Sequence, residues 1–151
     1  MSPIDRSQLA NDLVAAIAKA ADRATAATWI IGQLKASLPH YTWAGIYWLE
    51  GDELVLGPYL GKPSPHVRIP LHRGICGAAA SQQQTIIVDD VNSDPRYLAC
   101  SIETKSEIVV PIMRGPTVLG EIDIDSDQPA AFSDADRTLL ETVAQALAER
   151  D

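Results

Sequence analysis

Two pairs of strand-like segments, each joined by a short turn, are the sequence feature that most constrains the fold. The segment 41–49 is rich in Tyr, Trp and Ile, and Gly51-Asp52 separates it from a second strand-like segment at 53–60. A further pair of strand-like segments, 107–113 and 118–125, flanks a short Gly-Pro turn. Strands joined by such short turns pair antiparallel, because a parallel pair needs a crossover of about a dozen or more residues. The hairpins therefore exclude a doubly wound parallel sheet.

Helical patterns flank these hairpins at both ends of the sequence. Apolar residues recur at spacings of three and four over 5–37, which is typical of an amphipathic helix, with a break near 21–25. Ser133 and Asp136 predict the start of a C-terminal helix, and a shorter helix is expected at 78–82. We therefore predict an α+β domain with the terminal helices on one face of an antiparallel sheet. The short helix and the loops then cover the other face or one end and form a pocket.

Length and charge limit the number of domains and the kinds of partner. A chain of 151 residues, 46% of them hydrophobic, predicts one globular domain over 1–151. The net charge of −8 argues against nucleic acid or an anionic membrane as the main partner. No segment reaches the roughly 18 apolar residues of a membrane span, and the first residues lack the features of a signal peptide. We expect a cytoplasmic protein whose two cysteines rest as thiols.

The least ordinary segment is 120–125, which reads Gly-Glu-Ile-Asp-Ile-Asp. Alternation along a strand puts Glu121, Asp123 and Asp125 on one face. Asp is a poor strand former and neighbouring like charges repel, so this face is either solvated or the floor of a pocket that meets a cation. An amino group or a divalent metal would serve. Glu107 joins this face if the loop between the two strands has three or five residues, and lies on the other face if it has four.

The two cysteines are candidate reactive groups. Cys76 lies between two glycines near the start of the short helix, where backbone N–H groups and the helix dipole would lower the pKa of its thiol. Cys100 follows a turn around Pro95. For either cysteine taken alone, an inert buried thiol is the commoner case. A structural zinc site is not expected, because no His or Cys partners occur at the required spacing.

Aromatic residues offer a wall for the predicted pocket. Trp43 and Tyr47 are four positions apart on the first strand and therefore share a face, either as a core pair or as a pocket wall. The three histidines are expected at the surface. The sequence holds no Ser-His-Asp order, phosphate-binding glycine loop or dinucleotide fingerprint, which excludes those enzyme classes.

Several short motifs occur in order along the chain. They are 41–47 (Tyr-Thr-Trp-Ala-Gly-Ile-Tyr), 56–62 (Leu-Gly-Pro-Tyr-Leu-Gly-Lys), 67–70 (Val-Arg-Ile-Pro), 73–77 (Arg-Gly-Ile-Cys-Gly), 99–100 (Ala-Cys) followed by 106–107 (Ser-Glu), and 119–126 (Leu-Gly-Glu-Ile-Asp-Ile-Asp-Ser). Together they resemble one branch of the GAF domains, the free methionine-(R)-sulfoxide reductases. The resemblance runs from about Tyr41 to Leu147, nearly the whole chain.

The resemblance implies a GAF-like, six-stranded antiparallel sheet between helices and a closed pocket for one free amino acid. It implies that Cys100 and Cys76 are the redox pair. The substrate-binding residues that it implies are Trp43, Tyr47, Glu107, Asp123 and Asp125. Free methionine sulfoxide is then the substrate and thioredoxin the reductant, with no cofactor and no metal. A homodimer is a further candidate assembly, through the Leu and Ala stripe of the first helix.

The sequence departs from the family at His66. Many members carry a third cysteine there, immediately before Val-Arg-Ile-Pro, and in some members that cysteine resolves the oxidised intermediate. Either Cys76 takes this role, which gives a Cys76–Cys100 disulfide, or an external thiol does. We expect the thiolate of Cys100 to attack the sulfoxide sulfur while one carboxyl group of the cluster donates a proton, leaving a sulfenic acid on the cysteine.

Two other functions fit the same residues. One is a non-catalytic GAF module that binds a small ligand, since the bare fold hosts many functions. The other is a thiol redox sensor whose cysteines oxidise reversibly without a substrate. A tightly bound ligand without turnover would favour the first, and a disulfide formed by peroxide with no response to methionine sulfoxide would favour the second.

Overall fold

The computed structural model describes residues 5–98 and 103–151. Its elements, in chain order, are α1 (Arg6–Lys19), α2 (Arg23–Ser37), β1 (Trp43–Glu50), β2 (Glu53–Leu60), β3 (Arg68–Pro70), α3 (Gly74–Gln82), β4 (Ile86–Val88), the 3-10 turn η1 (Val91–Ser93), β5 (Ser106–Arg114), β6 (Thr117–Ser126) and α4 (Asp134–Glu149). The predicted antiparallel sheet is confirmed. It has six strands in the order β3-β2-β1-β6-β5-β4, and every neighbouring pair is antiparallel.

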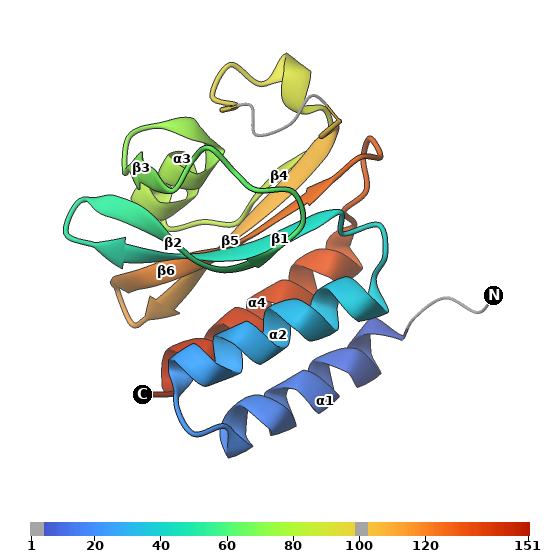
Figure 1. Cartoon of the computed structure of the whole chain (residues 1–151), viewed down its shortest axis with the longest axis vertical. Helices are drawn as coiled ribbons and strands as arrows, with labels where there is room; N and C mark the ends of the chain where they lie inside the picture. The colour runs from blue at the N-terminus through green and yellow to red at the C-terminus, as the bar shows by residue number, and fades with distance from the viewer. Residues whose placement is uncertain (1–4, 99–102) are drawn as a thin grey trace.

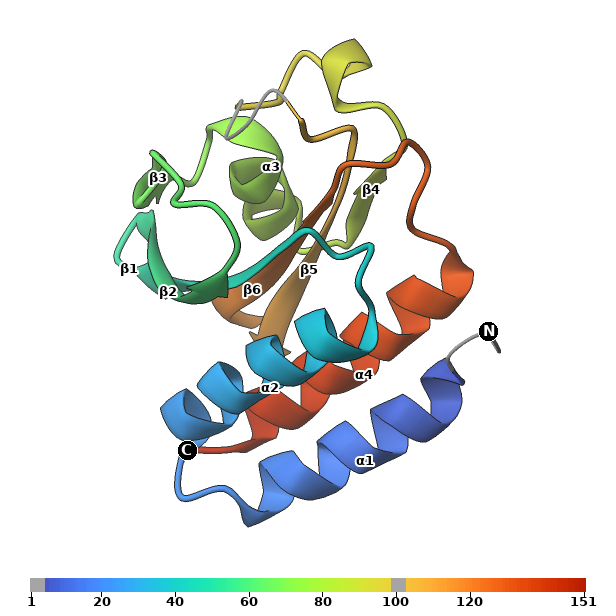
Figure 2. The same cartoon turned by 45° about the vertical axis from the view of Figure 1, so that its right-hand side comes forward.

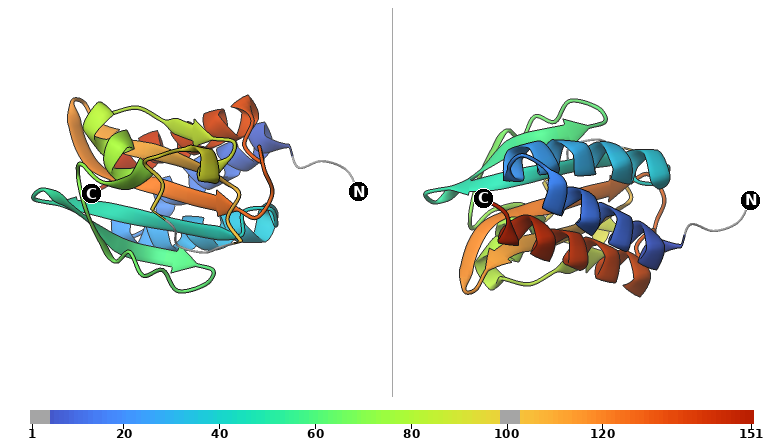
Figure 3. Two further views of the ribbon diagram at one scale, coloured as in Figure 1. Left: turned by 90° about the horizontal axis from the view of Figure 1, so that it is seen from above. Right: turned by 90° about the horizontal axis from the view of Figure 1, so that it is seen from below.

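The elements form layers around the sheet (Figure 1). Helices α2 and α4 pack on one face of the sheet, and α1 lies outside them and contacts both (Figure 2). Helix α3 and the loops of the chain's middle cover the opposite face, as the view from above in Figure 3 shows. The predicted division, with terminal helices on one face and the short helix on the other, is confirmed. No helix among the described residues is both long and apolar enough to cross a membrane.

The predicted break in the N-terminal helix separates α1 from α2. Asp22 caps α2 by accepting a hydrogen bond from the Thr25 N–H at 2.8 Å, so a new helix begins directly after the break. The apolar stripe of α1, at Ala10, Leu13 and Ile17, is buried within the chain's own core. That stripe is therefore occupied, and a homodimer stays a prediction.

Alternation along the two long strands divides their side chains between two cores. Ile122 and Ile124 of β6 enter the large core beneath α2 and α4, together with Ile108 and Val110 of β5. The intervening side chains point to the α3 face, where Val109 joins a second, smaller apolar cluster. This smaller cluster surrounds the acidic residues of β6.

The buried carboxylate of Asp136 links helices α1 and α4 to the segment that precedes strand β1. Asp136 accepts hydrogen bonds from the Tyr41 hydroxyl at 2.6 Å, the Arg6 guanidinium at 2.9 Å and the Ser133 N–H at 2.9 Å. Ser133 and Asp136 form the predicted capping box of α4. Burial disfavours the charged carboxylate, yet these donors together hold the pKa of Asp136 below its ordinary value.

Replacing Asp136 should therefore destabilise the whole domain. Asp136→Ala removes the reciprocal half of the capping box and leaves the buried Tyr41 hydroxyl without its acceptor, for an expected loss of about 2–4 kcal/mol in the free energy of unfolding. Urea denaturation followed by circular dichroism measures it. The exposed Asp134, on the first turn of the same helix, is the matched control, and Asp134→Ala should cost less than about 1 kcal/mol. Equal losses in the two variants would contradict the role of Asp136.

Candidate functional site

Four carboxyl groups lie buried on the α3 face of the sheet. Glu121, Asp123 and Asp125 alternate along β6, and they are 0%, 3% and 2% exposed. Glu107 of β5 is 5% exposed and joins them. The interpretation of this strand face as solvated is therefore wrong, and the alternative of a pocket floor that meets a cation stays a prediction.

A β-bulge places Glu107 among the other three. The β5–β6 hairpin pairs Arg114 with Thr117 across a two-residue turn. Continued without interruption, that register would bring Glu107 opposite Ile124, on the other face of the sheet. An irregularity between Ile112 and Met113 shifts the pairing by one residue, so Glu107 lies opposite Asp125.

The thiol of Cys76 faces these carboxyl groups from α3. Cys76 is 6% exposed, and its Sγ donates a hydrogen bond to Asp123 Oδ2 at 3.3 Å. Burial, followed by the charges of Asp123, Glu121 and Glu107, raises the pKa of this thiol well above its ordinary value. The predicted lowering of the pKa by the helix N-terminus is wrong, because burial and the nearby carboxylates outweigh the helix dipole.

The carboxyl groups favour their protonated forms. Burial first, and then the charges of Asp123 and Asp125, raise the pKa of Glu107 well above its ordinary value. Glu107 also shares hydrogen bonds with both aspartates, and these bonds raise its pKa further while lowering theirs. Burial of so many carboxyl groups together therefore favours a proton held within the cluster that Glu107, Asp123 and Asp125 share. Burial also raises the pKa of Glu121 and Asp125 well above the ordinary value and raises that of Asp123.

Several oxygen atoms of this cluster have no hydrogen-bond partner among the residues that the structure describes. Both carboxyl oxygens of Glu121 and one each of Asp123 and Asp125 are buried without a partner within 5–98 and 103–151. None of the four carboxyl groups forms an ion pair with a described Lys, Arg or His. An unsatisfied buried polar atom typically costs about 1–3 kcal/mol. Such a group of acceptors is suited to a bound cation or hydrogen-bond donor.

Two aromatic side chains of β1 line the same face. Trp43 lies opposite Asp125 and Tyr47 opposite Glu121, with their ring centroids 6.5 Å apart. Gly45 lies between them, where a Cβ atom would overlap the indole of Trp43. Trp43 Nε1 donates to the Lys62 carbonyl at 2.9 Å, so the indole is held over the sheet. The predicted shared face of Trp43 and Tyr47 is confirmed.

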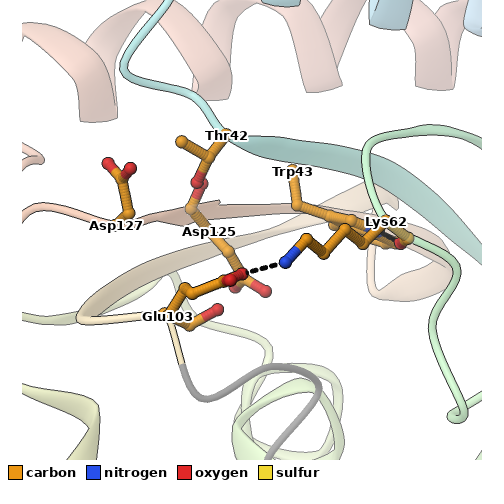
Figure 4. A pocket seen from close by; sticks show the side chains of 7 residues that line it. Thr42, Trp43, Lys62, Glu103, Asp125 and Asp127 are labelled. Carbon is orange, nitrogen blue, oxygen red and sulfur yellow. Dashed lines mark hydrogen bonds and ion pairs between the residues drawn. The ribbon is translucent and has the colours of Figure 1, made fainter.

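The cluster borders two cavities. The larger, about 410 Å³, is lined by Thr42, Trp43, Lys62, Glu103, Thr104, Asp125 and Asp127. Figure 4 shows Lys62, Glu103 and Asp125 converging there, with Lys62 and Glu103 joined as an ion pair. The smaller, about 20 Å³, is lined by Tyr47, His66, Ile69, Gly74, Ile75, Cys76, Leu98, Glu107 and Asp123. It is large enough for about one water-sized body.

The structure brings together most of the predicted site residues. Trp43, Tyr47, Cys76, Glu107, Asp123 and Asp125 all line the two cavities. Cys100 lies outside the described residues, while Leu98 and Glu103, which precede and follow it, line the smaller and the larger cavity. Alternation along the strand predicts that Glu121 shares this face, but Glu121 is not among the predicted substrate-binding residues. The sequence-based prediction missed Lys62 as a cavity residue, and no spacing signal marks it.

The chain is similar to proteins of known family. Residues 5–150 match the family model for the GAF domain. Protein YtsP of Bacillus subtilis is 41% identical over 119 residues, which cover 75% of this chain and 72% of that protein. The free methionine-R-sulfoxide reductase of Escherichia coli is 42% identical over 109 residues, which cover 72% of this chain and 66% of the relative. A free methionine-R-sulfoxide reductase of Neisseria meningitidis, solved in complex with its substrate, superposes with a TM-score of 0.91 at 31% identity, over 99% of this chain and 92% of that one.

The burial of Glu121 should make stability fall as the pH rises. Its pKa is raised in the folded state, so folding retains a proton that the unfolded chain releases above about pH 4.5. Its contribution is therefore favourable below that pH and is lost as the pH rises through the folded-state pKa. Glu121→Met removes this penalty and should stabilise the domain by about 1–3 kcal/mol at pH 8, and by less at pH 5.

Urea denaturation at both pH values measures the effect. The exposed Glu50 offers a matched control, and Glu50→Met should change stability by less than about 0.5 kcal/mol at either pH. A loss of stability in Glu121→Met at pH 8 would show that the carboxylate is favourably held.

Proposed function

Because the chain belongs to the GAF-domain family of free methionine-R-sulfoxide reductases, we propose that it reduces free methionine-(R)-sulfoxide to methionine at this site. The observation that carries the proposal is the set of four buried carboxyl groups facing a thiol, with aromatic side chains beside them. A free amino acid supplies an ammonium group that buried carboxylates can bind. A sulfoxide supplies an oxygen that a protonated carboxyl group can activate.

Charged side chains that line the larger cavity recognise the substrate. The ammonium group of the substrate binds Asp125 and its neighbours through charge-assisted hydrogen bonds. Lys62 lines the same cavity, and its ammonium group exchanges its ion pair with Glu103 for the substrate carboxylate, so the cavity fits a zwitterion. The Trp43 indole packs against the apolar side chain of the substrate. A peptide-bound methionine sulfoxide lacks the free ammonium and is therefore a poor substrate.

Proton donation falls to the carboxyl cluster. Glu107 is the source of the proton, which passes along its hydrogen bond to Asp125, the member of the cluster that lines the larger cavity. The raised pKa of Glu107 keeps it neutral near pH 7, and its hydrogen bonds to Asp123 and Asp125 hold it in place. Hydrogen bonding to the sulfoxide oxygen makes the sulfur electrophilic. The negative charge that develops on that oxygen during attack is neutralised by this proton.

The two cysteines take different roles. The raised pKa of Cys76 keeps it as a thiol, which is a weak nucleophile, so Cys100 attacks the sulfoxide sulfur. The sulfoxide oxygen passes to Cys100 as a sulfenic acid, and methionine is released. The Cys76 thiol then condenses with the sulfenic acid, which forms the Cys76–Cys100 disulfide and one water. Asp123, which accepts the Cys76 hydrogen bond, takes the thiol proton and passes it to the leaving hydroxide, which departs as that water.

A dithiol protein of the thioredoxin class then regenerates the enzyme. Its two thiols reduce the Cys76–Cys100 disulfide by thiol–disulfide exchange and are themselves oxidised to a disulfide. His66 stands at the position of the third cysteine found in many family members, so the cycle proposed here uses two cysteines only. A cytoplasmic location remains a prediction that fits these resting thiols.

A substrate panel tests the proposed reaction. The purified protein is mixed with thioredoxin, thioredoxin reductase and NADPH, and the loss of NADPH absorbance is followed. Free L-methionine-(R)-sulfoxide should be turned over, and the S epimer should not. The N-acetylated R sulfoxide should react at least about 100-fold more slowly, because the acetyl group removes the ammonium that the carboxylates bind. Equal rates on the free and acetylated substrates would contradict ammonium recognition, and no turnover with any reductant would favour a ligand-binding module.

Single cysteine variants separate the two roles. Cys100→Ser should abolish turnover with any reductant. Cys76→Ser should release one methionine per protein without a reductant and lose thioredoxin-supported turnover while keeping turnover with dithiothreitol. Mass spectrometry of the oxidised wild type should show one disulfide. Unchanged thioredoxin-supported turnover in Cys76→Ser would mean that an external thiol resolves the intermediate, and full activity in Cys100→Ser would overturn the mechanism.

A further inference from the structure

The proposed reaction does not explain why a thiol and two carboxyl groups lie so close together at the smaller cavity. Cys76 Sγ, one Glu107 carboxyl oxygen and one Asp123 carboxyl oxygen all lie within 4.8 Å of one another, and all three residues are buried. They come from α3, β5 and β6, so no local sequence spacing reveals them as a set. A thiol and two carboxyl groups held this close in a protein interior have the donor atoms and the spacing to bind a metal ion.

The geometry of these three donors fits a small cation. Zn²⁺ binds thiolate sulfur at about 2.3 Å and carboxylate oxygen at about 2.0–2.2 Å, which places neighbouring tetrahedral ligand atoms about 3.5 Å apart. The separation of 3.3 Å between Cys76 Sγ and Asp123 Oδ2 is close to that value. The cavity that these donors line has a volume of about 20 Å³, which suits one ion and excludes a whole methionine sulfoxide.

Unpartnered oxygen atoms next to the three donors supply an independent observation. Both carboxyl oxygens of Glu121, which is 0% exposed, and one oxygen of Asp123 are buried without a hydrogen-bond partner in the described part of the chain. Glu121 shares its strand face with Asp123, and its charge acts on the Cys76 thiol. A cation at the three donors would satisfy these acceptors and offset a cluster that has no ion-pair partner among the described side chains.

We propose that the reduced, substrate-free site binds one Zn²⁺ through Cys76, Glu107 and Asp123, with a fourth position open to water or to Glu121. The thiol and carboxyl protons are released to solvent as the ion binds. A mixed thiolate and carboxylate set favours Zn²⁺ over Mg²⁺, which prefers an octahedron of oxygen atoms. The bound ion occupies the proton donor and the resolving thiol, so zinc inhibits the reductase. Zinc binding stands independently of the proposed function, whereas the inhibition rests on it.

Direct zinc titration tests the site without an activity assay. Reduced protein is freed of metal with a chelator, desalted and titrated with Zn²⁺ in competition with a colorimetric zinc indicator. One equivalent should bind, and excess Mg²⁺ should not displace it. Cys76→Ser and Glu107→Gln should each weaken binding by at least about 100-fold, because each removes a ligand or its charge. Circular dichroism is used to check that each variant is folded. If only one of the two variants folds, its zinc affinity alone tests the site.

Matched controls make the outcome specific to these donors. Asp127→Asn, an exposed acidic residue on the neighbouring cavity, should bind zinc as the wild type does. Protein oxidised with methionine sulfoxide should lose the site, because the disulfide consumes the thiol of Cys76. No saturable binding by the wild type, or wild-type affinity in Cys76→Ser or in Glu107→Gln, would overturn the zinc site.

Turnover measured in chelator separates this inference from the proposed function. Turnover without zinc binding would overturn the zinc site alone. Zinc binding without turnover would support the site and contradict the reductase.

Discussion

The burial of four carboxyl groups on one sheet face, with no ion-pair partner among the described residues, is the constraint on which the rest of the site depends. Charge in such a place is unfavourable, so the cluster holds protons at a pH where exposed carboxyl groups have lost theirs. The sheet that carries this cluster is stabilised by the large core beneath α2 and α4 and by the hydrogen bonds to Asp136. The fold thus maintains an arrangement that is locally unfavourable and chemically useful.

The same cluster assigns different roles to groups that lie side by side. Burial first, and then the charges of the neighbouring carboxyl groups, raise the pKa of the Cys76 thiol, and burial likewise raises the pKa of Glu107. A cation entering this site, whether an ammonium group or a metal ion, reverses both tendencies because it favours carboxylates and thiolates. Substrate binding and the chemistry that follows are therefore coupled through the charge of the ligand.

Much of the fold follows from local patterns in the sequence. Short turns between strand-like segments predict the antiparallel sheet, and alternation along β6 predicts that its three acidic residues share a face. Which face Glu107 joins depends on a bulge that leaves Leu119 of β6 unpaired. Pro111 and Gly120 beside it are typical of bulges, but they do not specify where the pairing shifts. The pKa of Cys76 was also beyond prediction, because it depends on residues of β5 and β6 that are distant in the sequence. Long-range packing, and not local pattern, determined both.

The central claim is that a carboxylic acid, centred on Glu107, stays neutral in the resting site at pH 7. The most direct test is carbon-13 NMR of protein labelled at the glutamate side-chain carboxyl carbons, titrated from pH 4 to pH 9. Wild-type protein should show a protonated carboxyl resonance that persists at pH 7 and is absent from Glu107→Gln. If every glutamate resonance of the wild type reaches its ionised position below pH 5, the buried cluster is fully charged and the proposed proton donor does not exist.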